Sequence, residues 1–232
     1  MASTTPSRIM QVLSAGAVSP GLLKVLAGFS RETGIEVNVV FATAPEIRRR
    51  LSAPESADLV IGPIELLDDF RRSGKVTGHS AIIGRIGIGV LIRDGAPPPK
   101  IGTVDEFKRS LLAARAIVYN RASTGAYLEK LFEQLGVAAL LQDRSTRYDD
   151  FAAVRDHIRN GPGGEIGFGA ITVIIENSDK GIRFIGPLPR ELQNYTTYAA
   201  AAMTHPCGAD NAAHELLSYI DSPAAKMIWI AA

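Results

Sequence analysis

Strand and helix patterns alternate along the first 73 residues of the chain, and this alternation limits the possible folds more than any other feature. The predicted strands, which are short apolar or β-branched runs, cover 9–15, 35–41 and 58–62. The predicted helices between and after them cover 19–33, 45–52 and 65–73. Because helical connections between neighbouring strands produce parallel sheets with right-handed crossovers, the chain is predicted to be an α/β protein.

A second β-α series lies inside the first and predicts two lobes. Its strands are expected at 85–93, 116–119, 165–169, 182–185 and 195–203. Its helices are expected to begin at Thr103 and to cover 123–135 and 148–159, and two C-terminal helices are expected at 210–220 and 223–231. We therefore expect lobe I at 1–86 plus 196–232 and lobe II at 87–195, each with a mixed, mostly parallel sheet. The hinge crossings are expected near 85–90 and 190–198.

The turn from Asn120 to Gly125 is the best candidate for a binding site. It joins an apolar strand directly to an amphipathic helix, so it directs backbone N–H groups and the positive end of a helix dipole at one place. Ser123 and Thr124 there could bind an anion, cap the helix or act in catalysis. Arg121 adds a cation that could contact the ligand, or could form an ion pair with Asp149 or Asp150.

Charge and residue counts exclude several function classes. The formal net charge of +1 and the scattered Lys and Arg residues argue against nucleic-acid binding. The one basic cluster, 48–50, falls in a predicted helix and is interpreted as a solvated face. A single cysteine, Cys207, excludes an internal disulfide and is interpreted as a bystander thiol. The four histidines lack ligand-like spacing, so neither a metal site nor a cofactor is expected.

The N-terminus lacks the pattern of a secretory leader, and no run is long enough to cross a bilayer. As written, the chain is expected to be cytoplasmic and not inserted in a membrane. It is expected to be periplasmic if the natural protein carries a leader ahead of this sequence. In that case an ABC permease is the expected partner.

Several motifs, in this order and spacing, resemble one family over nearly the whole chain. They are the segments 12–17, 33–37, 41–44, 57–62, 118–127, 165–170 and 185–198. The chain resembles the type II periplasmic solute-binding proteins, in the branch related to molybdate-binding proteins. The resemblance implies a two-lobed, Venus-flytrap α/β fold that closes on a small anion. Asp58, which matches the family in position only, is expected to brace the loop at 15–17 by hydrogen bonds rather than to touch the ligand.

The sequence departs from the molybdate-binding pattern at positions that matter for the ligand. Ala17 and Ala44 stand where the family has hydroxyl-bearing residues, and Phe168 stands where a tyrosine is expected. Arg121 can instead grip a carboxylate with two parallel hydrogen bonds, so an organic carboxylate is the expected ligand. The predicted ligand-binding residues are Ser14, Gly16, Ala17, Thr43, Ala44, Asn120, Arg121, Ser123, Thr124, Gly125, Gly169 and Ala170.

The same resemblance offers an enzymatic alternative, because this branch is also similar to aconitate isomerase. Such a reaction moves a proton in an unsaturated polycarboxylic acid and needs an acid or base beside an anion-binding group. No catalytic residue is assigned from the sequence. The candidates are Ser14, Glu65, Ser123, Thr124 and Tyr195, and none forms a recognisable pair with a histidine.

Overall fold

The computed structural model describes residues 9–53, 57–204 and 210–231, and the chain divides into two compact units. Unit 1 is Met1–Arg85 with Thr197–Ala232, and unit 2 is Ile86–Thr196. The chain enters unit 2 within strand β4 (Val76–Arg93) and leaves it within strand β9 (Tyr195–Met203). Each unit is a mixed sheet with helices, which confirms the predicted two-lobed α/β class.

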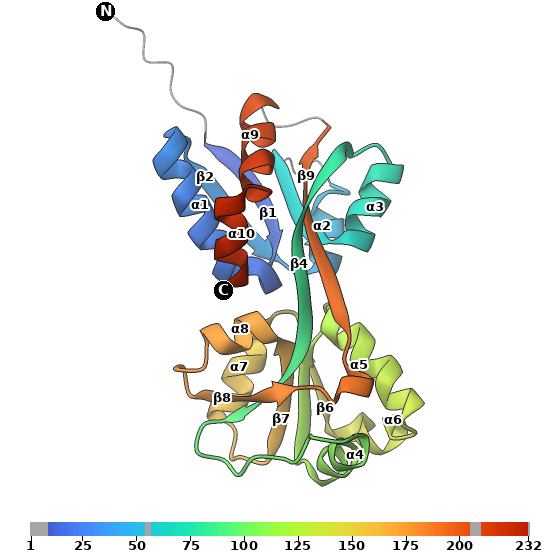
Figure 1. The fold of residues 1–232 in the computed structure, drawn as a ribbon. Helices are drawn as coiled ribbons and strands as arrows, with labels where there is room; N and C mark the ends of the chain where they lie inside the picture. Colours follow the sequence, from blue (N-terminus) through green and yellow to red (C-terminus); the bar gives the residue numbers. More distant parts are fainter. Residues whose placement is uncertain (1–8, 54–56, 205–209, 232) are drawn as a thin grey trace, which may run out of the picture. The chain divides into compact units, whose positions relative to one another are not determined.

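Unit 1 contains a sheet with the strand order β2-β1-β3-β9 (Figure 1). Its other elements are β1 (Met10–Ala15), α1 (Ser19–Thr33), β2 (Val37–Ala42), α2 (Ala44–Arg50), β3 (Leu59–Pro63), α3 (Ile64–Arg72), α9 (Asp210–Ile220) and α10 (Pro223–Ile230). Strand β1 pairs in parallel with β2 and β3, whereas β9 pairs antiparallel with β3. The carboxyl ends of β1, β2 and β3 therefore lie at one edge of this sheet.

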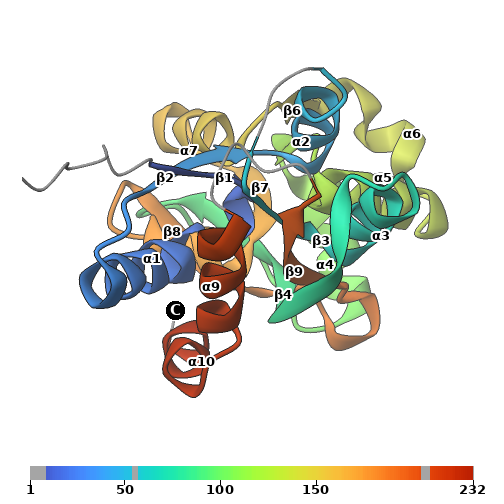
Figure 2. The same ribbon diagram turned by 90° about the horizontal axis from the view of Figure 1, so that it is seen from above.

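Helix α1 packs against α9 and α10, and the three helices lie side by side in Figures 1 and 2. The contact includes an edge-to-face pair between Phe29 and Tyr219, with ring centroids 5.6 Å apart. Gly34 ends α1 in the left-handed conformation, with φ of 75°, as expected for a glycine C-cap.

Unit 2 contains a sheet with the strand order β8-β4-β7-β5-β6. Its other elements are α4 (Val104–Ala113), β5 (Ala116–Asn120), α5 (Ser123–Gln134), α6 (Ala138–Leu141), β6 (Ser145–Tyr148), α7 (Phe151–Asn160), β7 (Glu165–Ala170), α8 (Ile171–Glu176) and β8 (Ile182–Pro187). Strand β5 pairs in parallel with β6 and β7, and β4 pairs antiparallel with β7 and β8. The carboxyl ends of β5, β6 and β7 thus share one edge.

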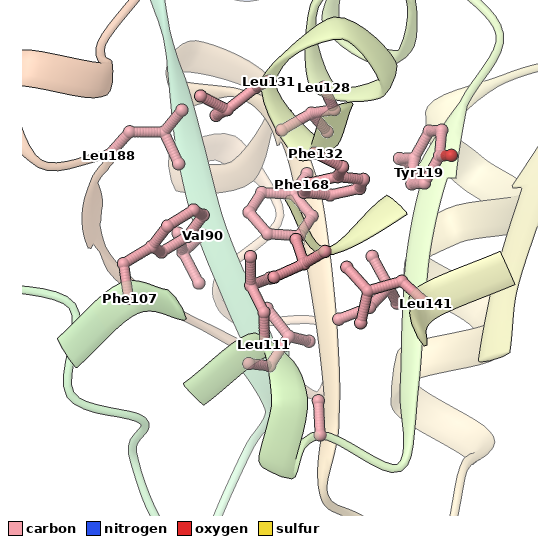
Figure 3. Packing of buried hydrophobic residues seen from close by; sticks show 14 of the residues in the cluster. Val90, Phe107, Leu111, Tyr119, Leu128, Leu131, Phe132, Leu141, Phe168 and Leu188 are labelled. Atoms are coloured by element: carbon pink, nitrogen blue, oxygen red, sulfur yellow. The ribbon is translucent and has the colours of Figure 1, made fainter. Parts of the chain in front are cut away.

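Both faces of the unit 2 sheet are buried, because alternate strand residues enter different apolar clusters. Tyr119 and Phe168 pack with residues of α4 and α5 on one face, as Figure 3 shows. Val118 packs with residues of α7 and α8 on the other face. Burial on both sides explains why the inner strands β5 and β7 appear in the sequence as apolar runs.

Glycines on β4 and β7 make room for aromatic rings over the sheet. Gly89 lies opposite Gly169 in the β4–β7 register. A Cβ atom at Gly169 would lie 2.6 Å from the ring of Phe151, and one at Gly89 would lie 2.8 Å from Phe184. The absence of side chains at these positions lets the rings approach the backbone closely.

The side chain of Gln193 substitutes for a strand residue beside β4. Its Oε1 accepts from the N–H of Ile88 at 2.9 Å, and its Nε2 donates to the carbonyl of Ile88 at 2.9 Å. A carboxamide can do both because it carries a donor and an acceptor, like a peptide group. In addition, the hydroxyl of Tyr127 on α5 donates to the Leu192 carbonyl at 2.9 Å. These bonds fix the segment that leads out of unit 2.

The structure differs from the prediction at four elements. The helix expected over 148–159 begins at Phe151, because Asp150 caps it by accepting from the N–H of Ala153 at 2.8 Å. Residues 145–148 form strand β6 instead. The strand expected over 85–93 begins at Val76, and helix α8 was not predicted because its β-branched residues resemble a strand.

Candidate functional site

Strand β5 and helix α5 of unit 2 are joined by a two-residue turn, Arg121 and Ala122. The side chain of Asn120 accepts from the N–H of Ala122 at 3.3 Å, and the N–H of Arg121 donates to the Tyr148 carbonyl at 2.8 Å. The N-cap of α5 is Ala122, and no side chain caps the helix. The first-turn N–H groups therefore lack partners within the helix and are oriented for an anion.

Ser123 and Thr124 occupy the first helical positions of α5, so they do not cap it. Of the three roles considered from the sequence, the capping role is wrong, because the residue in the capping position is Ala122. Their hydroxyls stand beside the free end of the helix, where a ligand could be contacted. Ser123 directly follows the N-cap position, which Ala122 occupies. The sequence alone could not show this, because the first residue of the helix was not known.

Gly125 holds the first turn of α5 against the end of β5. A Cβ atom at this position would lie 1.9 Å from the carbonyl oxygen of Asn120 and 3.0 Å from the ring of Tyr119. Only glycine permits this approach, since the obstructing atom is a backbone oxygen that cannot rotate away. Gly125 thus fixes the direction in which the first-turn N–H groups point.

Arg121 forms an ion pair with Asp149, with Nη1 2.7 Å from Oδ1. The two side chains are 60% and 90% exposed, so the pair is solvated and contributes little to stability. Asp150, the other partner considered, caps α7 instead. Because a solvated pair is easily exchanged, Arg121 remains available to a carboxylate ligand.

Two more predicted residues lie at the same edge of unit 2. Gly169 and Ala170 end β7, which runs parallel to β5 with Val118 opposite Gly167. This register puts Asn120 level with Gly169. Ala170 precedes α8, whose N-terminus also has no side-chain cap. The structure therefore brings all the predicted unit 2 residues to one edge of its sheet.

The predicted residues of unit 1 gather in the same way at the carboxyl edge of its sheet. Gly16 and Ala17 form a 3₁₀ turn, Gly16–Val18, between β1 and α1. Thr43 is the N-cap of α2 without a side-chain capping bond, and Ala44 is the first residue of that helix. Strands β1 and β2 are in parallel register with Ser14 opposite Phe41, so these two turns are neighbours.

Ser14 is the least accessible of the predicted residues. Its relative exposure is 0%, and its hydroxyl donates to the carbonyl of Ala15 at 3.2 Å. A ligand could reach it only after local rearrangement. Its burial also weakens its case as a catalytic acid or base.

Asp58 stabilises strand β1 at the opposite edge, so the prediction that it braces the 15–17 loop is wrong. Its Oδ2 accepts from the N–H of Gln11 at 2.7 Å, and its own N–H donates to the Gln11 carbonyl at 2.8 Å. Asp58 precedes β3 and therefore lies at the amino ends of the parallel strands. Residues 15–17 lie at the carboxyl end of β1, so Asp58 and this turn are at opposite ends of the strand.

Two acidic residues begin helices at the carboxyl edge of unit 1, and they differ in their surroundings. Hydrogen bonds from Arg49 and Arg50 lower the pKa of Glu46 to about 2. Glu65, in the first turn of α3, is exposed and has no ion-pair partner in the described part of the chain. Burial, and then the charge of Glu65, raise the pKa of Tyr198 to about 12. Glu65 and Tyr198 are thus electrostatically coupled.

Within residues 9–53, 57–204 and 210–231, no group of three His, Cys, Asp or Glu residues could hold a metal ion. In the same part of the chain, no helix is long and apolar enough to span a membrane. Cys207, interpreted from the sequence as a bystander thiol, lies outside the described residues.

The sequence matches one family model, described as bacterial extracellular solute-binding protein, over residues 10–232. Among curated proteins, aconitate isomerase from Pseudomonas sp. is 29% identical over 236 residues, which cover 96% of this chain and 86% of that protein. These matches confirm the resemblance recognised in the sequence motifs.

Solved structures share the fold at low sequence identity. The periplasmic molybdate-binding protein of Azotobacter vinelandii superposes with a TM-score of 0.77 at 17% identity, covering 96% of each chain. PEB3 of Campylobacter jejuni with L-phospholactate bound has a TM-score of 0.71 at 16% identity, covering 95% of this chain and 96% of that one. Both likenesses establish the two-lobed solute-binding fold.

Proposed function

Because the chain belongs to the bacterial extracellular solute-binding protein family, we propose that it binds a small organic anion, and specifically a carboxylate. The observation that carries this proposal is the first turn of α5 in unit 2, which has no side-chain cap and which Gly125 holds against Asn120. Among the residues that the structure describes, none accepts a hydrogen bond from the N–H groups of Ser123, Thr124 and Gly125 in this turn. A helix N-terminus without a side-chain cap favours an anionic ligand as its hydrogen-bonding partner.

A carboxylate is favoured over molybdate by the residues that surround such an anion. Ala17 and Ala44 offer no hydroxyl in unit 1. A tetrahedral oxyanion needs many donors, and this chain has lost two of them. Arg121 in unit 2 suits a planar carboxylate, which can accept two parallel hydrogen bonds from one guanidinium. The residues named from the sequence remain proposed contacts, each within its own unit, except Ser14, whose side chain is buried.

The first test is a thermal-shift screen of the whole chain over molybdate, sulfate, and di- and tricarboxylates. A ligand that binds the folded state raises the melting temperature by mass action. Stabilisation by one or more carboxylates, with little effect of molybdate, is the expected result. Stabilisation by molybdate alone would overturn the proposed ligand class.

Arg121→Ala provides a sharper test of the site. We expect ligand affinity to fall roughly tenfold or more, since a charge-assisted hydrogen bond is lost. The melting temperature without ligand should barely change, because the ion pair with Asp149 is solvated. Asp149→Ala is the matched control, since it breaks the same pair and keeps the arginine. Equal melting shifts with and without ligand in Arg121→Ala would make Arg121 structural.

A second candidate function is isomerisation of an unsaturated polycarboxylic acid. The 29% identity to aconitate isomerase over 96% of the chain supports it. Glu65 is the strongest candidate base, because it is exposed and has no ion-pair partner among the described residues, whereas Ser14 is buried. Incubation with cis- or trans-aconitate, followed by NMR of the alkene protons, distinguishes binding from turnover. Conversion that is abolished in Glu65→Gln would favour the enzyme, and no conversion of either isomer would favour binding alone.

A further inference from the structure

The ion pair between Arg121 and Asp149 in unit 2 uses only part of the guanidinium. One hydrogen bond of 2.7 Å joins Nη1 to Oδ1, and no other residue that the structure describes accepts a bond from this arginine side chain. A guanidinium carries five N–H donors, arranged so that two of them can bind one carboxylate in parallel. A ligand carboxylate that accepts two such bonds would therefore be held more firmly than Asp149 is.

The backbone keeps Asp149 within reach of Arg121. The residue before it, Tyr148, ends β6 in register with the last residue of β5, and its carbonyl accepts from the Arg121 N–H at 2.8 Å. The residue after it, Asp150, caps helix α7. Because the chain is fixed on both sides of Asp149, its carboxylate stays close to Arg121 even when the arginine binds another anion.

Asp149 contributes little to the folded structure itself. Its side chain is 90% exposed, and Arg121 is its only side-chain partner in the described part of unit 2. A pair as solvated as this one adds little to stability. The effect of the Asp149 charge therefore falls on what Arg121 can bind.

We propose that Asp149 is an internal competitor for Arg121. It occupies the arginine while the site is empty, and a ligand carboxylate must displace it. The ligand succeeds because it can accept two bonds where Asp149 accepts one. Asp149 thereby lowers the affinity of the site and favours release of the ligand. This inference rests on the proposed function, because it concerns the same arginine and the same ligand carboxylate.

The first variant is Asp149→Asn, tested by calorimetric titration of the whole chain with tricarballylate and trans-aconitate. We expect the dissociation constant to fall roughly two- to fivefold, because an exposed ion pair no longer has to be broken. The melting temperature without ligand should not change. Glu129→Gln is the matched control, since it removes the same charge from another solvated pair of unit 2, with Arg147 at 2.8 Å. It should leave the dissociation constant unchanged.

A double variant separates competition for Arg121 from general repulsion of the ligand. In an Arg121→Ala background, Asp149→Asn should leave the dissociation constant unchanged, because no guanidinium remains to compete for. If the gain in affinity persists there, Asp149 acts only through its charge, and the inference is wrong. If the wild-type chain binds a carboxylate and Asp149→Asn binds it no more tightly, the inference is also wrong, but the proposed function stands. If the wild-type chain binds neither carboxylate, the proposed function fails, and this inference fails with it.

Discussion

Replacing Gly125 with alanine tests whether the first turn of α5 must lie against β5. The new Cβ would be 1.9 Å from the Asn120 carbonyl oxygen. A close carbon–oxygen contact is about 3.3 Å, so the helix and the strand must separate by roughly 1.4 Å. Overpacking of this kind costs about 1–3 kcal/mol, with the upper end expected for a backbone obstruction. The better helix propensity of alanine offsets up to about 1 kcal/mol.

We therefore expect Gly125→Ala to lower the free energy of unfolding by about 2 kcal/mol, measured by urea denaturation without ligand. A shift of this size also moves the first-turn N–H groups away from a bound anion, so affinity should fall at least tenfold. Gly16→Ala is the matched control, because a Cβ there meets nothing within 4 Å. It should change stability by no more than about 1 kcal/mol. A Gly125→Ala protein as stable as the wild type, with unchanged affinity, would refute the reasoning.

Two further predictions concern unit 1. The pKa of Tyr198 is raised to about 12 from 10.0, so its contribution to stability is complete below pH 10 and is lost as the pH rises through 12. Urea denaturation at pH 9 to 12 should show the wild type losing up to about 2 kcal/mol more stability than Tyr198→Phe. An equal loss in the two proteins would contradict this. Asp58→Ala should cost about 1.5–3 kcal/mol, because it removes the charged acceptor of the Gln11 N–H. A urea midpoint equal to that of the wild type would show that Asp58 is dispensable.

The α/β class could be predicted because hydrophobic period and glycine position are local properties. Gly34 ends α1, and Thr103 caps α4 by accepting from the N–H of Glu106 at 3.2 Å, as expected. Strand β6 was missed because its sequence, Ser145–Tyr148, has no apolar run. It forms a strand only because β5 offers it a partner.

The candidate site was predicted less completely than the fold. The turn at Asn120–Gly125 has a local signature, so its geometry could be anticipated. The sequence could not show that Tyr198 lies at the carboxyl edge of the unit 1 sheet, since its position depends on pairing with Pro63, which is 135 residues away in the sequence. A tyrosine next to an alanine run predicts only a strand. The burial that raises the pKa of its hydroxyl is a property of the folded environment.

The insertion of unit 2 within unit 1 has a consequence for the order of folding. Residues 86–196 are contiguous, so all strands of unit 2 have left the ribosome before β9 is complete. The sheet of unit 1 is completed later, because β9 pairs with β3, and Leu59 pairs with Ala202. Until then β3 exposes an unpaired apolar edge, which is prone to aggregation. A nascent chain that has emerged only as far as Thr196 should therefore present a folded second unit and an unfinished first one, and a chaperone would be needed most at this stage.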